Sequence, residues 1–366
     1  MSGAIRLLLT GGGTGGHLFP AVAVAEEIGR QLPGSRVHFV GTKRKLDRER
    51  LTSLGFEVST IDSQGLKGKK LTSLVSAMVL LPISFFQAMQ RIRKFQPDLV
   101  LGVGGYVTGP VLTAARTLGI KTVIHEQNSV PGLANRKLGG LVNRVCLSLP
   151  GSESYFPAAK VRMTGNPVRS DLRALAEKKR SRQEGEKCLL ILGGSLGAHG
   201  VNLLVSEALC EADGKLSEGL TIIHQTGEKD EEMVRDRYRQ AGLNASVHGF
   251  IADMAAVYDK ADFLVSRAGA TTLAELGVLG KPALLIPYPH AADNHQRING
   301  DHYVKGGGAV LFEESELTPE KLRDELFGIL TDGKKLEVMS DAMKKLGSPA
   351  AAENIVEVCL ELLADA

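Results

Sequence analysis

Two stretches of the chain decide the fold: residues 5–17, IRLLLTGGGTGGH, and residues 187–200, KCLLILGGSLGAHG. Each begins with an apolar run that is typical of a buried strand and continues into a glycine-rich turn. A helical pattern follows both turns. Because a strand, a glycine turn and a helix occur twice in this order, we predict two α/β domains of similar construction.

Further apolar runs alternate with helical patterns in both halves of the chain. They lie at residues 36–41, 99–105 and 122–128, and then at 221–227, 246–251, 262–269 and 282–289. Such alternation predicts right-handed βαβ units and parallel sheets. The predicted fold class is therefore α/β, with two doubly wound, Rossmann-like domains that face each other across a cleft. Ligands of such sheets bind beyond the carboxyl ends of the strands.

The chain has 366 residues, which is more than one ordinary domain contains. We predict an N-terminal domain at residues 1–165, a C-terminal domain at 166–340, and a helical segment at 341–366 that the pattern assigns to neither. The four cysteines lack the spacing of a metal site or a redox pair, which favours a reducing compartment. The apolar run at the N-terminus is too short for a signal peptide, so we expect a cytoplasmic protein.

Charge is distributed unevenly between the two halves. Residues 1–165 contain 21 Lys and Arg against 9 Asp and Glu, a net charge of +12, whereas the rest contains 23 against 32, a net charge of −9. A basic half beside an acidic half suggests that one half faces a polyanion, for which nucleic acid and anionic lipid are both candidates. An accident of surface composition is the alternative.

The first glycine turn has the spacing of a dinucleotide-binding loop. Residues 11–17, GGGTGGH, contain G-x-G-x-x-G, but a nicotinamide site also needs an acidic residue at the end of the second strand, where this chain has Gly41 and Thr42. The glycines still let backbone N–H groups approach an anion at a helix N-terminus. The second glycine turn repeats the arrangement, with three residues placed for a diphosphate: Gly193, Gly194 and Ser195.

Two polar loops follow strands in the basic half. Residues 102–110, GVGGYVTGP, form a third glycine turn, and residues 125–132, HEQNSVPG, place His125, Glu126, Gln127 and Asn128 at a strand's carboxyl end. Each of these side chains could simply satisfy a hydrogen bond within the loop. Together, at an edge where sites form, they favour binding of sugar hydroxyls.

The stretch from Ser266 to Asn299 is the most specific. A helix is predicted to begin near Thr271, with Glu275 in its early turns, where the carboxylate could accept hydrogen bonds from both hydroxyls of a ribose. Favourable placement of a carboxylate near a helix N-terminus is the alternative. The next strand leads to a polar cluster suited to the hydroxyls of a donor sugar: Asp293, Asn294, His295 and Gln296.

Metal-binding patterns are missing from the sequence. It has neither a D-x-D motif at a strand end nor a set of His, Cys and carboxylate residues with metal-ligand spacing. We therefore expect no metal and no cofactor. Helix N-termini and arginine are expected to neutralise phosphate charge instead.

Seven motifs, in order, resemble the MurG family of peptidoglycan N-acetylglucosaminyltransferases, which have the GT-B fold. They are GGTGGHLFPAVAVA, GLKGK, GVGGYVTGPV, HEQNSVPGLANR, TGNPVR, LGGSLGA and AGATTLAEL, and the resemblance covers essentially the whole chain. It implies an inverting, UDP-GlcNAc-dependent hexosyltransferase. The acceptor would be lipid I, undecaprenyl-diphospho-MurNAc-pentapeptide, and the product lipid II. The resemblance also implies a role in peptidoglycan synthesis, cell shape and cell division, at the cytoplasmic side of the inner membrane.

Site residues follow from the glycine loops and from the family's motifs. The donor-binding positions are Thr14, Gly15, Gly16, Asn128, Arg169, Gly194, Ser195, Ile251, Ala270, Thr271, Thr272, Leu273, Ala274, Glu275 and Gln296. The resemblance implies that the backbone of Ile251 recognises uracil, although the pattern alone places Ile251 in the core. The acceptor-binding positions are Gly104, Gly105, Tyr106, Thr108 and Glu126. His295 departs from the family, because many relatives have glutamine there.

His17 is the candidate general base, since it lies in the acceptor domain at the predicted cleft and unperturbed histidine is mostly neutral at cytoplasmic pH. A His17 that only hydrogen-bonds the acceptor phosphate or the backbone is the alternative. For the whole chain, the rivals are another GT-B enzyme, such as a UDP-GlcNAc 2-epimerase, and a nucleotide-sugar-binding module without catalysis. The expected partners are UDP-GlcNAc, lipid I and an anionic membrane surface, and no nucleic acid.

An uncharged run at residues 71–90, LTSLVSAMVLLPISFFQAMQ, lies between strands of one domain, so we do not expect it to span a membrane. At helical spacing, one set could face the sheet: Leu71, Leu74, Met78, Leu81 and Phe85. The membrane-facing set is then Val75, Val79, Pro82 and Phe86. Lysines and arginines flank the run, which favours peripheral binding to anionic lipid; a fully buried helix is the alternative.

Overall fold

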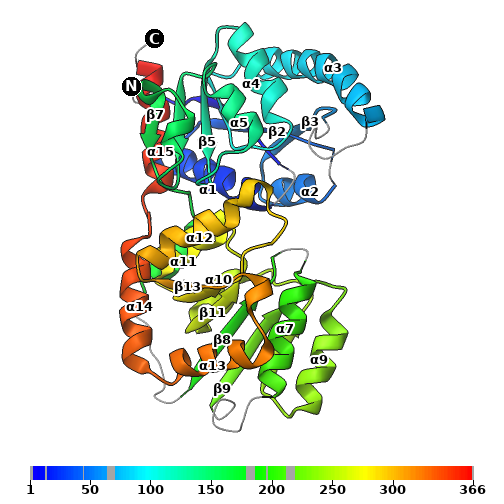
Figure 1. The fold of residues 1–366 in the computed structure, drawn as a ribbon. Helices are drawn as coiled ribbons and strands as arrows, with labels where there is room; N and C mark the ends of the chain where they lie inside the picture. Colours follow the sequence, from blue (N-terminus) through cyan, green and yellow to red (C-terminus); the bar gives the residue numbers. More distant parts are fainter. Residues whose placement is uncertain are drawn as a thin grey trace. The chain divides into compact units, whose positions relative to one another are not determined.

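The computed structural model describes residues 3–12, 15–43, 45–63, 71–178, 186–194, 197–211 and 219–364. The chain divides into two compact units. We call Met1–Ser170 together with Ser348–Ala366 the first domain, and Asp171–Gly347 the second domain. Both have the α/β architecture shown in Figure 1.

The first domain contains a seven-stranded parallel sheet in the order β3-β2-β1-β4-β5-β6-β7. Its strands are β1 (Arg6–Thr10), β2 (Arg36–Gly41), β3 (Glu57–Thr60), β4 (Leu99–Gly102), β5 (Lys121–Glu126), β6 (Arg144–Leu147) and β7 (Val161–Met163). Leu7, Leu8 and Leu9 in the central strand β1 are fully buried. Successive side chains of a strand point to opposite faces, so both faces of this sheet need a cover of helices.

Helices cover both faces of the first sheet. They are α1 (Gly15–Gln31), α2 (Lys45–Ser53), α3 (Leu71–Phe95), α4 (Thr108–Thr117), α5 (Leu133–Leu138) and α15 (Ala351–Ala364), with the 3₁₀ helices η1 (Glu153–Tyr155) and η2 (Ala158–Lys160). On one face, Ile28 of α1 and Ile355 of α15 join the cluster around Leu7 and Leu9. On the other, α3, α4 and α5 pack around Leu8.

The second domain repeats this design with a six-stranded parallel sheet in the order β10-β9-β8-β11-β12-β13. Its strands are β8 (Lys187–Leu192), β9 (Leu220–Gln225), β10 (Ala245–His248), β11 (Phe263–Ser266), β12 (Ala283–Leu285) and β13 (Ala309–Leu311). Its helices are α6 (Ser170–Ala176), α7 (His199–Cys210), α9 (Glu231–Gln240), α10 (Met254–Lys260), α11 (Ala270–Leu279), α12 (His295–Lys305), α13 (Pro319–Leu330) and α14 (Gly333–Lys345), with η3 (Ala292–Asn294) and η4 (Glu314–Glu316). A large buried cluster lies between β8, β9, β11, α7, α9 and α13.

The α/β fold class and the repeated design are confirmed. Every apolar run named from the sequence contains a strand, whereas β3, β6, β7 and β13 were not predicted. The C-terminal helix, which the pattern assigned to neither domain, belongs to the first. The predicted boundaries lie a few residues before the observed divisions at Ser170 and Gly347. That the two domains face each other across a cleft stays a prediction.

Helix α3 corrects one detail of the sequence analysis. The expectation that Leu81 faces the sheet is wrong, because its side chain is 44% exposed. The buried stripe of α3 is formed instead by Ser84, Ala88 and Ile92, which follow one another at i, i+4 and i+8. Phe85 is half-buried against the same cluster, as expected.

The outward face of α3 is apolar. Pro82 and Ile83 are exposed, and Phe86 is 67% exposed. Figure 1 shows α3 extending past its neighbour α4. The side chains of residues 71–79, which include Val75 and Val79, lie outside the described residues. Within the described part of the chain, no helix is both long and apolar enough to cross a membrane.

Candidate functional site

Each sheet has one switch point, where the strand order reverses and where α/β domains bind ligands. In the first domain this point lies between β1 and β4. The turns after these strands touch, because a Cβ on Gly11 would collide with the side chain of Val103, and one on Gly105 with the carbonyl oxygen of Gly12. Gly105 also has a φ of +85°, which glycine adopts without strain. Both turns therefore depend on glycine.

His17 lies at this switch point, in the first turn of α1, and is half-buried. Its Nδ1 is 3.1 Å from Oε1 of Gln127, which follows β5. Gly104 lies against the imidazole ring, since a Cβ there would be 2.9 Å from both Nδ1 and Cε1 of His17. The switch point thus holds a histidine whose ring is supported on one side by a glycine and on one nitrogen by an amide.

Behind His17, a chain of buried polar groups continues into the domain. The amide nitrogen of Gln127 donates to the carbonyl oxygen of Val103 at 2.9 Å and lies 3.1 Å from Nδ1 of His125. Nε2 of His125 is 3.1 Å from the carbonyl oxygen of Gly165. Burial lowers the pKa of His125 to about 4, so the ring is neutral near neutral pH.

Glu126 organises the loop that follows β5. It is almost fully buried, and its two oxygens accept hydrogen bonds from the backbone and side chain of Asn128, the backbone of Gly132 and the side chain of Asn135. These four hydrogen bonds fix the path of the loop. A contribution of Glu126 to acceptor binding stays a prediction, and in this arrangement it would act through the loop that Glu126 holds.

The other predicted acceptor residues lie in the turn after β4. Thr108 is fully buried, and its hydroxyl donates to the carbonyl oxygen of Gly104 at 2.7 Å. Tyr106, by contrast, has a side chain that is 55% exposed. Thr108 therefore supports the turn from behind, whereas Tyr106 is accessible to a ligand.

The donor-binding residues predicted in the first domain lie in separate segments. Gly15 and Gly16 form the beginning of α1, and Thr14 lies outside the described residues. The guanidinium of Arg169 lies over the ring of Phe19, 4.9 Å from its centroid. Asn128 is half-buried, with its amide directed to Glu126.

The switch point of the second domain lies between β8 and β11. Gly194, just after β8, has a φ of +85°, is exposed, and has open space where a Cβ would be. A Cβ on Gly197 would collide with the carbonyl oxygen of Thr226, so this loop is packed against the end of β9. Ser195 lies outside the described residues. The exposed backbone at Gly194 suits the approach of an anion.

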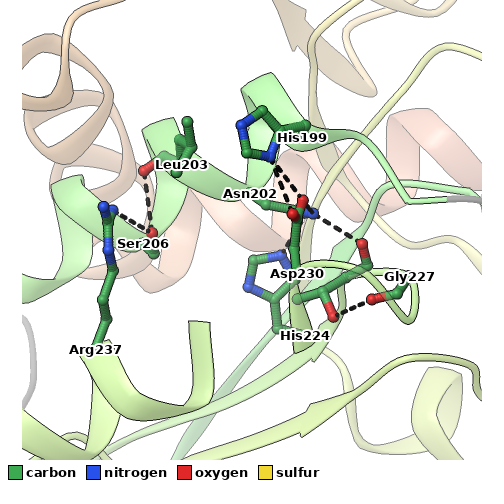
Figure 2. Close-up of polar contacts among 9 residues, drawn as sticks. His199, Asn202, Leu203, Ser206, His224, Gly227, Asp230 and Arg237 are labelled. Carbon is green, nitrogen blue, oxygen red and sulfur yellow. Dashed lines mark hydrogen bonds and ion pairs between the residues drawn. The ribbon is translucent and has the colours of Figure 1, made fainter. Parts of the chain in front are cut away.

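A polar network fixes the helix that follows this loop. Figure 2 shows His199 and Asn202 of α7 directed toward Asp230, at 3.0 and 2.7 Å. The Asn202 amide also donates to the carbonyl oxygen of Thr226 at 2.8 Å, and its oxygen lies 3.2 Å from Nε2 of the buried His224. Burial lowers the pKa of His224 to about 3, which keeps the ring neutral. The network fastens the N-terminus of α7 to the loop after β9.

Gln225 links two predicted donor-binding segments. It is the last residue of β9 and is nearly buried. Its amide nitrogen donates to the carbonyl oxygen of Gly194 at 3.0 Å, and its amide oxygen accepts the backbone N–H of Ile251 at 3.0 Å. Ile251 itself is buried, as its apolar side chain alone would predict.

Glu275 lies on α11, whose N-terminus follows β11. Glu275 is 8% exposed, and its carboxylate accepts a hydrogen bond of 2.8 Å from the hydroxyl of Tyr258, which is fully buried. Gly269 precedes the helix and has no side chain to cap the first N–H groups, at Ala270 to Thr272. The positive end of the helix dipole lies at the same place. Leu273 and Ala274 are buried against the domain.

The polar cluster after β12 has an unusual backbone. Asp293 and Asn294 have φ values of +53° and +52°, in the left-handed region that only short polar residues and glycine tolerate well. They lead into α12, where the half-buried Gln296 accepts the backbone N–H of Tyr288 at 2.9 Å. Nδ1 of His295 lies 2.7 Å from the carbonyl oxygen of Ala292.

Comparison with known proteins shows the family to which the chain belongs. The model of the glycosyltransferase family 28 N-terminal domain matches residues 7–147, and that of the C-terminal domain matches residues 188–355. The chain belongs to glycosyltransferase family 28. A relative from Desulfotalea psychrophila, named UDP-N-acetylglucosamine--N-acetylmuramyl-(pentapeptide) pyrophosphoryl-undecaprenol N-acetylglucosamine transferase, is 55% identical over 98% of this chain and 97% of its own.

Solved structures agree with the membership in family 28. MurG from Acinetobacter baumannii is 31% identical, with a TM-score of 0.77 over 98% of this chain and 99% of that chain. This relationship confirms the GT-B fold with two Rossmann-like domains. A UDP-GlcNAc 2-epimerase from Neisseria meningitidis, solved with UDP-GlcNAc, has a TM-score of 0.68 over 98% and 100% of the two chains, but at 18% identity it shows the fold alone.

Proposed function

We propose that this family 28 enzyme transfers GlcNAc from UDP-GlcNAc to undecaprenyl-diphospho-MurNAc-pentapeptide, forming lipid II by inversion at the anomeric carbon. The observation that supports this most strongly is the 55% identity, over 98% of the chain, to a relative named for that transfer. An epimerase shares the fold but not this level of identity. A binding module without catalysis would not need His17, the histidine that Gln127 and Gly104 hold at the switch point of the first domain.

The donor is assigned mainly to the second domain. The carboxylate of Glu275 accepts hydrogen bonds from the ribose, and the backbone of Ile251 recognises uracil. The diphosphate meets the exposed backbone at Gly194 and the N-terminus of α11, where N–H groups and helix dipoles favour negative charge. These fixed dipoles also stabilise the charge that grows on UDP as it departs.

The chemical step is assigned to His17. Its Nε2 removes the proton from the attacking acceptor hydroxyl while the new oxygen–carbon bond forms on the face opposite UDP. The bond between the anomeric carbon and the diphosphate oxygen breaks, and UDP leaves with the electron pair. General base catalysis of this kind contributes about 10²–10⁴ to the rate.

Incubation with labelled UDP-GlcNAc and a lipid I analogue tests the proposal. We expect labelled lipid II, with kcat lowered by about 10²–10⁴ in His17→Ala and the KM for UDP-GlcNAc much less affected. Conversion of UDP-GlcNAc to its 2-epimer without an acceptor would support the epimerase instead. A folded wild-type protein that binds UDP but transfers no sugar would contradict the assignment.

We also propose that the outward face of α3 binds the cytoplasmic leaflet of an anionic membrane. Ile83 and Phe86 are exposed apolar side chains on this face, together with Pro82. Arg93 and Lys94 follow in the last turn of the helix. Apolar residues next to cations suit an anionic lipid surface, where each nearby cation contributes about 1 kcal/mol. A lipid-linked acceptor would be met at this surface.

Co-sedimentation with vesicles tests this surface. Anionic vesicles should bind more protein than neutral ones, and salt should reduce the difference. The double variant Ile83→Ser, Phe86→Ser should bind less, whereas Val338→Ser, a change at a 68% exposed apolar residue on α14, should bind normally. Equal binding to both vesicle types, or an unaffected double variant, would count against α3.

A further inference from the structure

We propose that Gln127 is a positioning residue, which fixes the proton of neutral His17 on Nδ1 and leaves the lone pair of Nε2 to accept a proton. The inference rests on the proposed function, because it concerns the residue assigned there as the general base. It adds the group that sets the tautomer of that base, and three successive hydrogen-bond assignments support it.

The first assignment concerns His125. The ring is fully buried and neutral, so only one of its nitrogens bears a proton. Nε2 lies 3.1 Å from the carbonyl oxygen of Gly165, and a carbonyl oxygen only accepts. Ser148 is placed compatibly, with its hydroxyl 2.8 Å from Nε2 and directed toward the same carbonyl oxygen at 3.4 Å. Nε2 is therefore the donor, and Nδ1 of His125 has the lone pair.

The second assignment concerns the amide of Gln127. Its nitrogen faces the carbonyl oxygen of Val103 at 2.9 Å and Nδ1 of His125 at 3.1 Å, and the carbonyl oxygen of His125 lies farther away at 3.4 Å. A reversed amide would place its oxygen against a carbonyl oxygen and a lone pair, and both hydrogen bonds would be lost. Gln127 is 2% exposed, so water does not compensate for such a loss. The amide orientation is thus fixed from two directions.

The third assignment concerns His17. The amide oxygen of Gln127 faces Nδ1 of His17 at 3.1 Å, and this oxygen can only accept. In neutral His17 the proton is therefore on Nδ1. Gly104 lies against the ring edge that contains Nδ1 and Cε1, which restricts rotation of the ring. Free imidazole side chains in water prefer the opposite tautomer, so the protein selects the form whose Nε2 is basic.

The use of an amide has a chemical consequence. A carboxylate partner would also orient the ring, but its negative charge would favour the imidazolium form, which cannot act as a base. An amide oxygen orients the ring without adding charge. The amide therefore sets the tautomer without favouring the imidazolium form.

Long-range ¹H–¹⁵N correlation spectra of ¹⁵N-histidine-labelled protein measure the tautomer directly. In the wild type, under conditions where the imidazole of His17 is neutral, we expect the Nδ1–H form. In Gln127→Met, which keeps the size of the side chain without an acceptor, we expect the Nε2–H form to appear. We also expect kcat to fall about tenfold or more, because part of the base is then in the wrong tautomer, with little change in the KM for UDP-GlcNAc.

Gln225→Met is the matched control, since Gln225 is also a nearly buried glutamine at the end of a strand. It should raise the KM for UDP-GlcNAc and leave the His17 tautomer unchanged. An Nε2–H tautomer of His17 in the wild type would overturn the proposal, whether or not Gln127→Met folds. A normal kcat in His17→Ala would remove the base assignment of the proposed function instead, and the spectra would still decide whether Gln127 sets the tautomer.

Discussion

Replacement of Glu275 by alanine is the most direct test of the donor site. In the structure Glu275 is 8% exposed, and the fully buried Tyr258 donates a hydrogen bond of 2.8 Å to its Oε2. This contact holds the carboxylate in place before any ligand arrives. If the ribose hydroxyls bind to Glu275, the substitution removes charge-assisted hydrogen bonds that need little further ordering of the side chain.

The expected magnitude follows from these contacts. A hydrogen bond to a charged group contributes about 1.5–3 kcal/mol, and about 1.4 kcal/mol corresponds to a tenfold change in affinity. The Kd for UDP should therefore rise roughly 10- to 150-fold in Glu275→Ala. Tyr258→Phe keeps the carboxylate but removes its neutral donor, so a smaller increase of about 2- to 10-fold is expected.

Isothermal titration calorimetry with UDP and with 2′,3′-dideoxy-UDP separates the ribose from the rest of the donor. The wild type should bind UDP roughly 10- to 150-fold more tightly than 2′,3′-dideoxy-UDP, and Glu275→Ala should bind both ligands with similar affinity. A urea titration checks that the variant remains folded, because loss of the Tyr258 contact is expected to lower stability by about 1 kcal/mol. Unchanged UDP affinity in Glu275→Ala, or a variant that still distinguishes the two ligands, would refute the ribose assignment.

Three further predictions follow from the structure. Gly104→Ala should lower kcat about 10- to 100-fold, because the added Cβ would be 2.9 Å from Nδ1 of His17. Gly119→Ala, also at positive φ but in open space, should leave kcat unchanged. Equal kcat values for the two variants in steady-state assays would contradict this prediction. The free energy of unfolding should decrease as pH falls from about 6.5 toward 4, since the pKa of His125 is lowered to about 4 and the unfolded chain takes up the proton first. Urea titrations of His125→Gln should show a free energy of unfolding that depends less on pH. The same pH dependence in the variant and the wild type would argue against His125 as the origin. Activity should survive EDTA, as helix N-termini are assigned the charge-neutralising role, and complete loss that Mg²⁺ restores would reverse that assignment.

The sequence predicted the strands that form the centre of each sheet and missed mainly those at the edges. β1 and β8 are recognisable because long apolar runs end in glycine, and burial on both faces of a parallel sheet requires such runs. β3 and β7 have no such run, since their residues are only half-buried or exposed. β6 is buried, but its four residues are too few to stand out from a loop.

At the candidate site, the sequence predicted where polar residues gather but not how they are connected. An acceptor contact of Glu126 and Thr108 stays a prediction, and the sequence did not show that their side chains also hydrogen-bond within the loops they belong to. Gln127 was assigned only to a polar loop. Its partner His17 lies 110 residues away in the chain, and pairs this distant leave no local spacing to detect. Tyr258 and Gln225 were missed for the same reason.

Both domains hold their glycine turns with a glutamine from the neighbouring strand. Gln127 follows β5, which pairs with β4, and Gln225 ends β9, which pairs with β8. A glycine turn that admits a ligand has no side chains of its own to fix it, so an adjacent strand must supply the hydrogen bonds. An amide donates on one side and accepts on the other, which lets Gln127 join Val103 to His17 and Gln225 join Gly194 to Ile251. It does so without charge. A carboxylate at either place would repel an anionic substrate, and a lysine would compete with backbone N–H groups for the phosphates.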